Sequence, residues 1–196
     1  MHYTENVSRA EAPFTILNRI KSIYEERGMC IVAIDGCSGA GKSTLAAHLA
    51  AASHASLIHT DDFFLPTELR TNERLDTPGG NIDYVRFQKE VISGISSGKS
   101  FNYKAYSCSS GEYCVVRIKC TPIYIIEGVY SLHPVWQNAI DLKVFMNVDP
   151  QTQLNRILGR SGAEKLNDFK NKWIPMENKY FDFYNIADIC DITVNS

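Results

Sequence analysis

The sequence predicts an α/β fold in which helices flank a mostly parallel, doubly wound sheet. Apolar runs of strand length alternate with segments whose apolar residues recur at helical spacing, which is typical of such a sheet. Residues 122–128 are apolar almost throughout, as expected for a strand buried on both faces. Residues 36–43, Gly-Cys-Ser-Gly-Ala-Gly-Lys-Ser, match the phosphate-binding pattern G-x-x-x-x-G-K-[ST] between an expected strand and an expected helix. The length suits one domain, residues 1–196.

Hydrophobic spacing and helix-end signals define the N-terminal elements. Residues 13–27 place apolar side chains on one helical face, with Pro13 in the first turn and Gly28 at the C-terminal stop. The run 29–34 is short, apolar and rich in β-branched residues, which favours a buried strand. The elements expected next are a helix over 44–51, a strand over 55–60, a loop over 66–81 and a helix over 83–96.

The C-terminal half adds a hairpin and further alternating elements. Residues 100–106 and 113–119 predict two strands around a turn at Gly111, so we expect a small β insertion over about 101–119. The elements expected after the apolar run at 122–128 are a strand over 141–148, a helix over 151–160, a helical segment over 167–184 interrupted at Pro175, and a strand over 191–194.

The composition argues against several classes of function. The net charge is −2, so no basic field attracts nucleic acid or an anionic membrane. Residues 1–12 are polar and lack the apolar core of a signal peptide, and no apolar run has the length of a membrane span. The six cysteines form no C-x-x-C pair and are expected to be reduced, as in a cytoplasmic protein. The sequence leaves open whether the chain forms a homo-oligomer.

The glycine-rich segment predicts a site for a nucleoside triphosphate. Its glycines allow consecutive backbone N–H groups to face one anion, and the N-terminus of the following helix adds a favourable dipole. Lys42 supplies a positive charge for the β- and γ-phosphates, and Ser43 supplies a hydroxyl for Mg²⁺. We therefore expect ATP and Mg²⁺ as cofactors. The residues expected to bind ATP are Gly36, Ser38, Gly39, Ala40, Gly41, Lys42, Ser43 and Thr44.

Acidic residues follow two of the expected parallel strands. Asp61 and Asp62 come directly after the second strand, and Glu127 lies near the end of the long apolar run. The carboxyl ends of parallel strands share one edge of a sheet, where ligands bind. A carboxylate at that edge can take the proton of an attacking hydroxyl, so Asp61 or Asp62 is the candidate base. Glu127, together with Asp62 and Ser43, is the candidate set for Mg²⁺.

Three segments together resemble the uridine kinase family: residues 34–44, the Asp-Asp-Phe-Phe of 61–64 and the Ile-Glu-Gly-Val-Tyr of 126–130. The similarity spans about residues 29–192, and the wider relatives include nicotinamide riboside kinase, pantothenate kinase and phosphoribulokinase. The resemblance implies a P-loop kinase fold and a phosphotransferase with an alcohol group as acceptor. It also implies that Asp61 is the catalytic base. The residues it implies for the substrate site are Asp61, Phe64, Asp76 and Tyr106.

The resemblance further implies a helical lid over about residues 155–175. Arg156 and Arg160 are four residues apart and share one face of the expected helix. Kinases of this kind close arginines over the transferring phosphoryl group, where negative charge is spread, so both are candidate catalytic residues. Gly159 and Gly162 flank the second arginine and are the expected hinges.

One segment departs from the uridine kinase pattern. Residues 106–113 keep Tyr106 but lack the aspartate, histidine and arginine that meet the pyrimidine in that family. The leading hypothesis is phosphorylation of the 5′-hydroxyl of a uridine- or cytidine-like nucleoside. The alternative is the same chemistry on a non-nucleoside small molecule with a hydroxyl group, of the pantothenate or sugar type. A third hypothesis is a nucleotide-binding regulatory protein without turnover.

Overall fold

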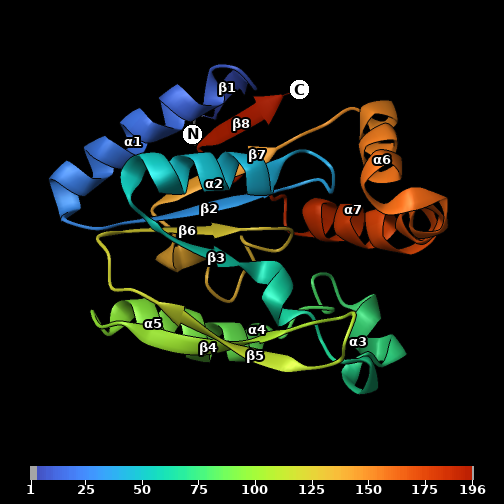
Figure 1. The fold of residues 1–196 in the computed structure, drawn as a ribbon. Coiled ribbons are helices and arrows are strands. Elements are labelled where there is room, and N and C mark those ends of the chain that lie inside the picture. Colours follow the sequence, from blue (N-terminus) through green and yellow to red (C-terminus); the bar gives the residue numbers. More distant parts are fainter. Residues whose placement is uncertain (1–3, 196) are drawn as a thin grey trace.

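The structure is a computed structural model that describes residues 4–195. Within this range a sheet of six strands forms the centre of the molecule, in the order β1-β8-β7-β2-β6-β3 (Figure 1). The strands of this sheet are β1 (Glu5–Ser8), β2 (Cys30–Gly36), β3 (Ser56–His59), β6 (Ile123–Glu127), β7 (Leu142–Met146) and β8 (Ile192–Asn195). Each strand runs parallel to its neighbours, as the alternating pattern of the sequence predicts.

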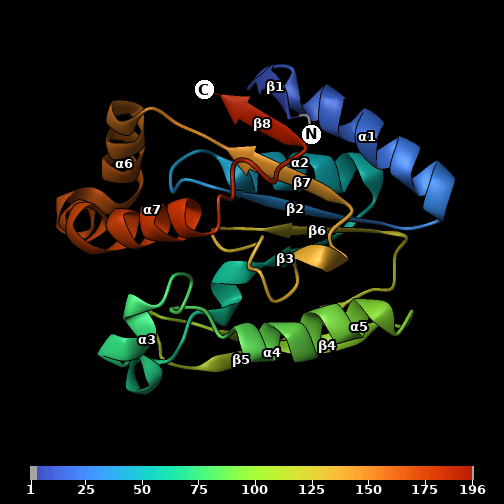
Figure 2. The same ribbon diagram turned by 180° about the vertical axis from the view of Figure 1, so that it is seen from behind.

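Helices pack on both faces of the sheet, which confirms the α/β prediction. One face carries α1 (Ala12–Arg27) and α2 (Lys42–Ser53) (Figures 1 and 2). The core of the other face holds the helical segment formed by α4 (Tyr84–Phe87), a π-helical turn and α5 (Ser93–Ser96), together with α7 (Ile174–Phe183). None of the helices in the described range is both long and apolar enough to cross a membrane.

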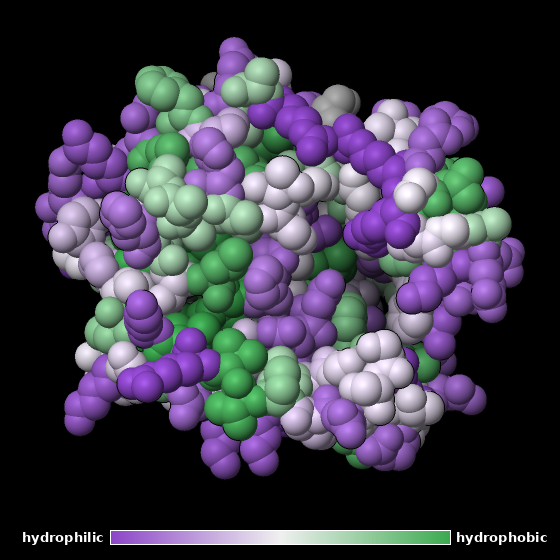
Figure 3. Space-filling view, viewed as in Figure 1, coloured by the Kyte–Doolittle hydropathy of each residue, from purple (hydrophilic) through white to green (hydrophobic). Residues whose placement is uncertain are grey.

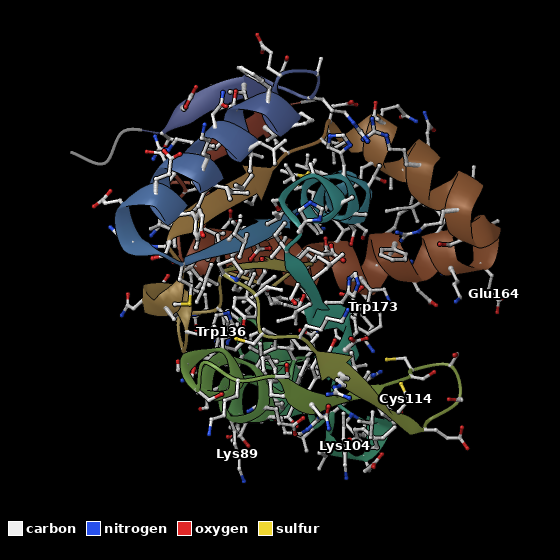
Figure 4. All side chains as sticks on the ribbon, turned by 60° about the vertical axis from the view of Figure 1, so that its left-hand side comes forward. Lys89, Lys104, Cys114, Trp136, Glu164 and Trp173 are labelled. Atoms are coloured by element: carbon white, nitrogen blue, oxygen red, sulfur yellow. The ribbon has the colours of Figure 1, made fainter. Side chains whose placement is uncertain are left out.

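The central strands are apolar throughout because both of their faces are buried. On β6, Ile123 and Ile125 pack into the core beneath α1 and α2, whereas Tyr124 and Ile126 pack into the opposite core. Successive side chains of a strand point to opposite faces, so this alternation requires apolar residues at every position. Trp136 lies between the sheet and the α4–α5 layer, where its ring stacks on Phe87 with 4.2 Å between ring centroids (Figure 4).

The expected hairpin is present beside the β3 edge of the sheet. β4 (Phe101–Tyr106) and β5 (Tyr113–Ile118) form a separate antiparallel pair with Gly111 in the connecting turn. The hairpin packs through Tyr103, whose ring centroid is 5.1 Å from that of Phe63. This contact attaches the hairpin to the segment that follows β3.

The N-terminal half contains one strand that the sequence did not predict and one segment whose prediction was wrong. Residues 1–12 received no element from the sequence, yet Glu5–Ser8 forms β1 and pairs with β8 at the edge of the sheet. Residues 66–81 were expected to be a loop, but they contain the short helix α3 (Asn72–Asp76), which Thr71 caps by accepting a hydrogen bond from the backbone N–H of Arg74.

The expected break at Pro175 was also wrong. α6 (Pro150–Asp168) continues through a π-helical turn into α7, and Pro175 stands in the first turn of α7, where a missing N–H is tolerated. The helical path is interrupted at Gly162 instead, where φ is 81° and ψ is 171°. Only a glycine adopts this backbone conformation readily.

The register of the sheet brings the motif residues together. Ile34 of β2 pairs with Glu127 of β6, and Glu127 pairs in turn with His59 of β3. The residues that follow these three positions therefore leave the sheet at the same edge. The phosphate-binding loop, Asp61 and Gly128 all lie there, as the sequence predicts.

Candidate active site

The glycine-rich loop connects β2 to the N-terminus of α2. Gly36, Gly39 and Gly41 have φ values of 128°, 77° and 97°, which favour glycine. A Cβ atom at Gly36 would lie 2.2 Å from the backbone oxygen of Met146, so β7 leaves room only for glycine there. α2 begins at Lys42, and its free N–H groups therefore face the loop.

The two basic residues of the loop region are held by backbone carbonyls. The ammonium of Lys42 is buried and donates to the oxygens of Gly36 at 2.8 Å and Cys37 at 3.0 Å. Arg156 of α6 donates to the oxygen of Gly39 at 3.1 Å. These bonds hold positive charge at the loop without neutralising it, as an anion site requires.

Ser43, Glu127 and His59 form a connected polar group at the strand ends. The Ser43 hydroxyl donates to Oε2 of Glu127 at 3.2 Å, and Nδ1 of His59 lies 2.6 Å from Oε1 of Glu127. The hydrogen bond with Glu127 raises the pKa of His59, and burial opposes it. His59 was not singled out in the sequence, although its pairing with Glu127 follows from the register of β3 and β6.

The arrangement of Ser43 and Glu127 fits Mg²⁺. A hydroxyl and a carboxylate oxygen lie within hydrogen-bond distance of each other, beside the phosphate-binding loop. Mg²⁺ in kinase sites takes one or two carboxylates and completes its coordination with phosphate oxygens and water. Among residues 4–195 no group of three His, Cys, Asp or Glu side chains is arranged to hold a metal ion.

Asp61 and Asp62 face different surroundings. Asp61 lines a cavity of about 770 Å³ together with Lys42 and Glu127. Asp62 accepts a hydrogen bond from the Tyr103 hydroxyl at 2.6 Å and does not line this cavity. The structure therefore separates the two aspartates: Asp61 lines the cavity beside Lys42, and Asp62 is bonded to the hairpin.

The side chain of Asp61 is exposed to the cavity, and protein atoms surround its carboxyl on the other sides. Desolvation by the surrounding protein raises its pKa to about 6, the carboxylates of Glu127 and Glu177 act in the same direction, and Lys42 opposes them. Gly128 makes this position possible, since a Cβ there would lie 2.1 Å from Oγ1 of Thr60 and 3.4 Å from Oδ1 of Asp61. A carboxyl with a pKa of about 6 can exchange a proton more readily near neutral pH than an ordinary aspartate.

The lid residues reach the same cavity. Arg156 and Arg160 of α6 line it, and the guanidinium of Arg160 lies 5.7 Å from the ring centroid of Phe169. Trp173 also lines the cavity and extends from the α6–α7 layer toward the segment after β3, whereas Glu164 lies at the outer end of that layer (Figure 4). Figure 3 shows the molecule hollowed between the region of α6 and α7 and the region of α3.

Two carboxylates that were not predicted from the sequence, Asp35 and Glu177, accept hydrogen bonds from the glycine-rich loop. Asp35 is fully buried and accepts four hydrogen bonds. The donors to Asp35 are the backbone N–H groups of Gly36 (2.8 Å), Tyr130 (3.1 Å) and Leu132 (3.0 Å) and the hydroxyl of Tyr180 (2.9 Å). Burial raises the pKa of Asp35 to about 6, although these bonds and Lys42 lower it. Asp35 directly precedes Gly36, which is the local signal that could have identified it.

The second carboxylate is Glu177 of α7. It accepts hydrogen bonds from the backbone N–H of Ser38 at 3.0 Å and from the Ser38 hydroxyl at 2.5 Å. Burial raises its pKa, while Lys42 and the two bonds from Ser38 oppose the rise. Gln153 of α6 donates to the oxygen of Ser38 at 2.9 Å. α6 and α7 are therefore both hydrogen-bonded to Ser38 of the glycine-rich loop.

Of the expected substrate residues, the structure brings Asp61 and Phe64 into the cavity and leaves two outside it. Asp76 is exposed at the end of α3, and its backbone oxygen accepts a hydrogen bond from Lys179 at 2.6 Å. The ring of Tyr106 packs on Tyr113 of the partner strand, with 5.1 Å between centroids. Neither residue lines the cavity.

The structure has an α/β P-loop kinase fold, which several solved structures share. No protein-family profile matches the sequence, and no curated protein does either. A possible uridine kinase from Bacillus stearothermophilus is 17% identical, with a TM-score of 0.66 over 92% of this chain and 99% of that one. The protein YGR205w is also 17% identical, with a TM-score of 0.63 over 96% and 94%.

A third solved structure has the same fold in a rearranged chain. YFH7 from Saccharomyces cerevisiae, provisionally described as a P-loop kinase with a circular permutation, is 10% identical, with a TM-score of 0.60 over 94% of this chain and 99% of that one. At such low identities the likeness establishes the fold. The reaction has to be argued from the side chains of this chain.

Proposed function

We propose that this protein is an ATP-dependent kinase that transfers the γ-phosphoryl group of ATP to a hydroxyl group of a small molecule. One observation carries the proposal. The carboxyl of Asp61, with a pKa of about 6, lies in the same cavity as the phosphate-binding Lys42. A nucleotide-binding regulatory protein would not need a base beside its phosphate site.

The residues of the cavity divide the work of phosphoryl transfer. Backbone N–H groups of Gly39 and of residues 41–44, together with the ammonium of Lys42, bind the phosphates, and Arg156 and Arg160 stabilise the charge that is spread over the transferring group. Ser43 and Glu127 would hold Mg²⁺, which when bound neutralises charge on the β- and γ-phosphate oxygens.

Asp61 acts on the acceptor side of the reaction. As the acceptor oxygen forms its bond to the γ-phosphorus and the bond from that phosphorus to the bridging oxygen of ADP breaks, Asp61 takes the hydroxyl proton. Its carboxylate is the basic form, which predominates above a pH of about 6. The products are ADP and the phosphorylated acceptor.

Two classes of acceptor follow from this chemistry. The name of the Bacillus stearothermophilus neighbour favours the 5′-hydroxyl of a nucleoside such as uridine or cytidine. Against it stands the segment after Tyr106, which lacks the residues that contact the pyrimidine in uridine kinases. A non-nucleoside hydroxyl compound is the second class. In either case the partner is a small molecule rather than nucleic acid or membrane.

Replacement of Asp61 tests the proposal. Asp61→Asn keeps the size of the side chain but removes the base, so acceptor-dependent ADP release is expected to fall by about 10²- to 10⁴-fold. The affinity for ATP, measured by calorimetry, is expected to stay within about threefold, because Asp61 does not bind phosphate. Asp62→Asn is the matched control and should retain most of the turnover. Unchanged turnover in Asp61→Asn would show that another group is the base.

A further inference from the structure

Arg70 is one of several charged side chains of the cavity that have no role in the reaction described so far. Arg70 lines the cavity, and no Asp or Glu oxygen of the described chain lies within 4.0 Å of its guanidinium. Its partners are neutral: Nε donates to the oxygen of Leu65 at 2.6 Å, and Nη2 lies 3.3 Å from Sγ of Cys108. By contrast, Arg86 pairs with Glu90 at 2.9 Å. Arg70 thus presents an uncompensated positive charge to the cavity.

Arg70 belongs to the acceptor side of the cavity. Leu65, which accepts its hydrogen bond, is four residues beyond Asp61, and the backbone N–H of Phe64 donates to the oxygen of Asp61 at 3.3 Å. The positive charges near the phosphate-binding loop come instead from Lys42, Arg156 and Arg9, whose Nη1 donates to the oxygen of Ala40 at 3.4 Å. Arg70 is therefore attached to the segment that carries the base.

A second unsatisfied group is attached to the same residue. Asn81 is 3% exposed and lines the cavity. Its side chain interacts with the hydroxyl of Tyr130, and its side-chain oxygen has no hydrogen-bond partner among the described residues. The backbone oxygen of Asn81 accepts a hydrogen bond from the N–H of Leu65 at 3.0 Å. Because a buried carbonyl oxygen is costly without a donor, a hydroxyl of the acceptor is the group that fits it.

The hairpin contributes the side chain of Cys108 to this end of the cavity. Cys108, in the turn that departs from the uridine kinase pattern, contacts Arg70 and lines the cavity. The turn therefore places the thiol of Cys108 against the guanidinium of Arg70. It lacks the aspartate, histidine and arginine that contact the pyrimidine in uridine kinases. The guanidinium keeps its planar donors available for a carboxylate or phosphate, which it binds with two parallel hydrogen bonds.

We infer that the phosphate acceptor is an anionic hydroxyl compound, whose carboxylate or phosphate group binds Arg70 while one of its hydroxyls donates to Asn81. The inference depends on the proposed kinase function and specifies the substrate class of the same cavity. Hydroxy acids and sugar phosphates share this chemistry, and the experiment separates them.

Matched acceptors provide the first test. ADP release is measured with pairs that differ in the anionic group: glycerate and glycerol, pantothenate and panthenol, ribose 5-phosphate and ribose. Uridine and cytidine serve as neutral nucleosides. We expect kcat/KM for one anionic member to exceed that of its neutral partner by about 10- to 100-fold, the usual value of a charged hydrogen bond. Stimulation by glycerate or pantothenate would indicate a hydroxy acid as the acceptor, and stimulation by ribose 5-phosphate would indicate a sugar phosphate.

Replacement of Arg70 provides the second test. Arg70→Gln is expected to raise KM for the active anionic acceptor by about 10- to 100-fold and to leave KM for ATP within about threefold. Arg70→Lys keeps the charge and should recover part of the loss. Arg117→Gln, an exposed residue of the hairpin, is the control and should change neither KM.

The failures of the two proposals can be distinguished. Asp61-dependent turnover with neutral acceptors alone, or an unchanged acceptor KM in Arg70→Gln, overturns the inference and leaves the kinase function intact. If no acceptor of either kind stimulates ADP release, the kinase function fails and the inference fails with it.

Discussion

At the scale of single residues, two aspartates with the same raised pKa have opposite surroundings. Asp35 is fully buried, and its carboxylate accepts four hydrogen bonds that join β2 to the segment after β6 and to α7. The carboxylate of Asp61 accepts no hydrogen bond from the described residues and is open to the cavity. Hydrogen bonds thus commit Asp35 to the structure, whereas Asp61 is free to take a proton.

The raised pKa of Asp61 predicts how turnover depends on pH. The base must be ionised, and with a pKa of about 6 it is protonated below that pH. We expect kcat at saturating substrates to rise about tenfold per pH unit below 6 and to level above about 7. The measurement is a profile from pH 5 to 8. An inflection near 4 would show that the cavity does not desolvate Asp61, and the residual rate of Asp61→Asn should be flat.

The residues that sequence reading could find are those whose role follows from their neighbours in the chain. Lys42, Ser43, Asp61 and Glu127 belong to motifs read over a few positions. The roles of Glu177, Arg70 and Asn81 depend on partners that the fold brings together, such as Ser38 for Glu177, 139 positions away. No local pattern contains that information, so these residues could be found only in the structure.

At the scale of elements, the proposed lid is hydrogen-bonded to the glycine-rich loop through both α6 and α7, and its helical path is interrupted once between them. Gln153 and Arg156 of α6 and Glu177 of α7 bind the backbone of the phosphate-binding loop. Between them the chain turns at Gly162, in a conformation that suits only glycine. Gly159, the other hinge expected from the sequence, lies in regular helix. The sequence predicted a helix break at Pro175, but Pro175 lies in the first turn of α7, where a proline does not interrupt the helix.

A substitution at Gly162 tests whether this turn serves the lid. Gly162→Ala has open space for its Cβ, so its cost is backbone strain of about 1–3 kcal/mol. We expect turnover to fall by about tenfold, which corresponds to about 1.4 kcal/mol in the barrier, because the strain alters how Arg160 meets the cavity.

A second glycine with a positive φ provides the control. Gly98 also has a positive φ, 63°, and open space for a Cβ, but it lies in the turn before β4. Gly98→Ala should lower the melting temperature and leave kcat unchanged. Equal effects of the two substitutions on kcat would mean that the turn at Gly162 has no special part in closure.

At the scale of the whole molecule, the sheet was predictable because the burial of its central strands is visible in the sequence as continuous apolar runs. β2 and β6 are apolar at nearly every position, as only strands covered on both faces are. β1 was not predictable, since four mostly polar residues at an edge have no such pattern. It forms because β8, far along the chain, offers it a parallel partner.

The cavity is lined by residues from widely separated parts of the chain, so a bound nucleotide should stabilise the entire fold. Arg9, Lys42 and Arg160 come from the segment after β1, from α2 and from α6. A non-hydrolysable ATP analogue with Mg²⁺ at a hundred times its dissociation constant is expected to raise the free energy of unfolding by about 2.7 kcal/mol, measured by chemical denaturation. At the same analogue concentration, Lys42→Ala should lose most of this gain because it removes a phosphate contact, while Arg117→Gln should keep it. A gain of the same size in Lys42→Ala would place the nucleotide elsewhere on the molecule.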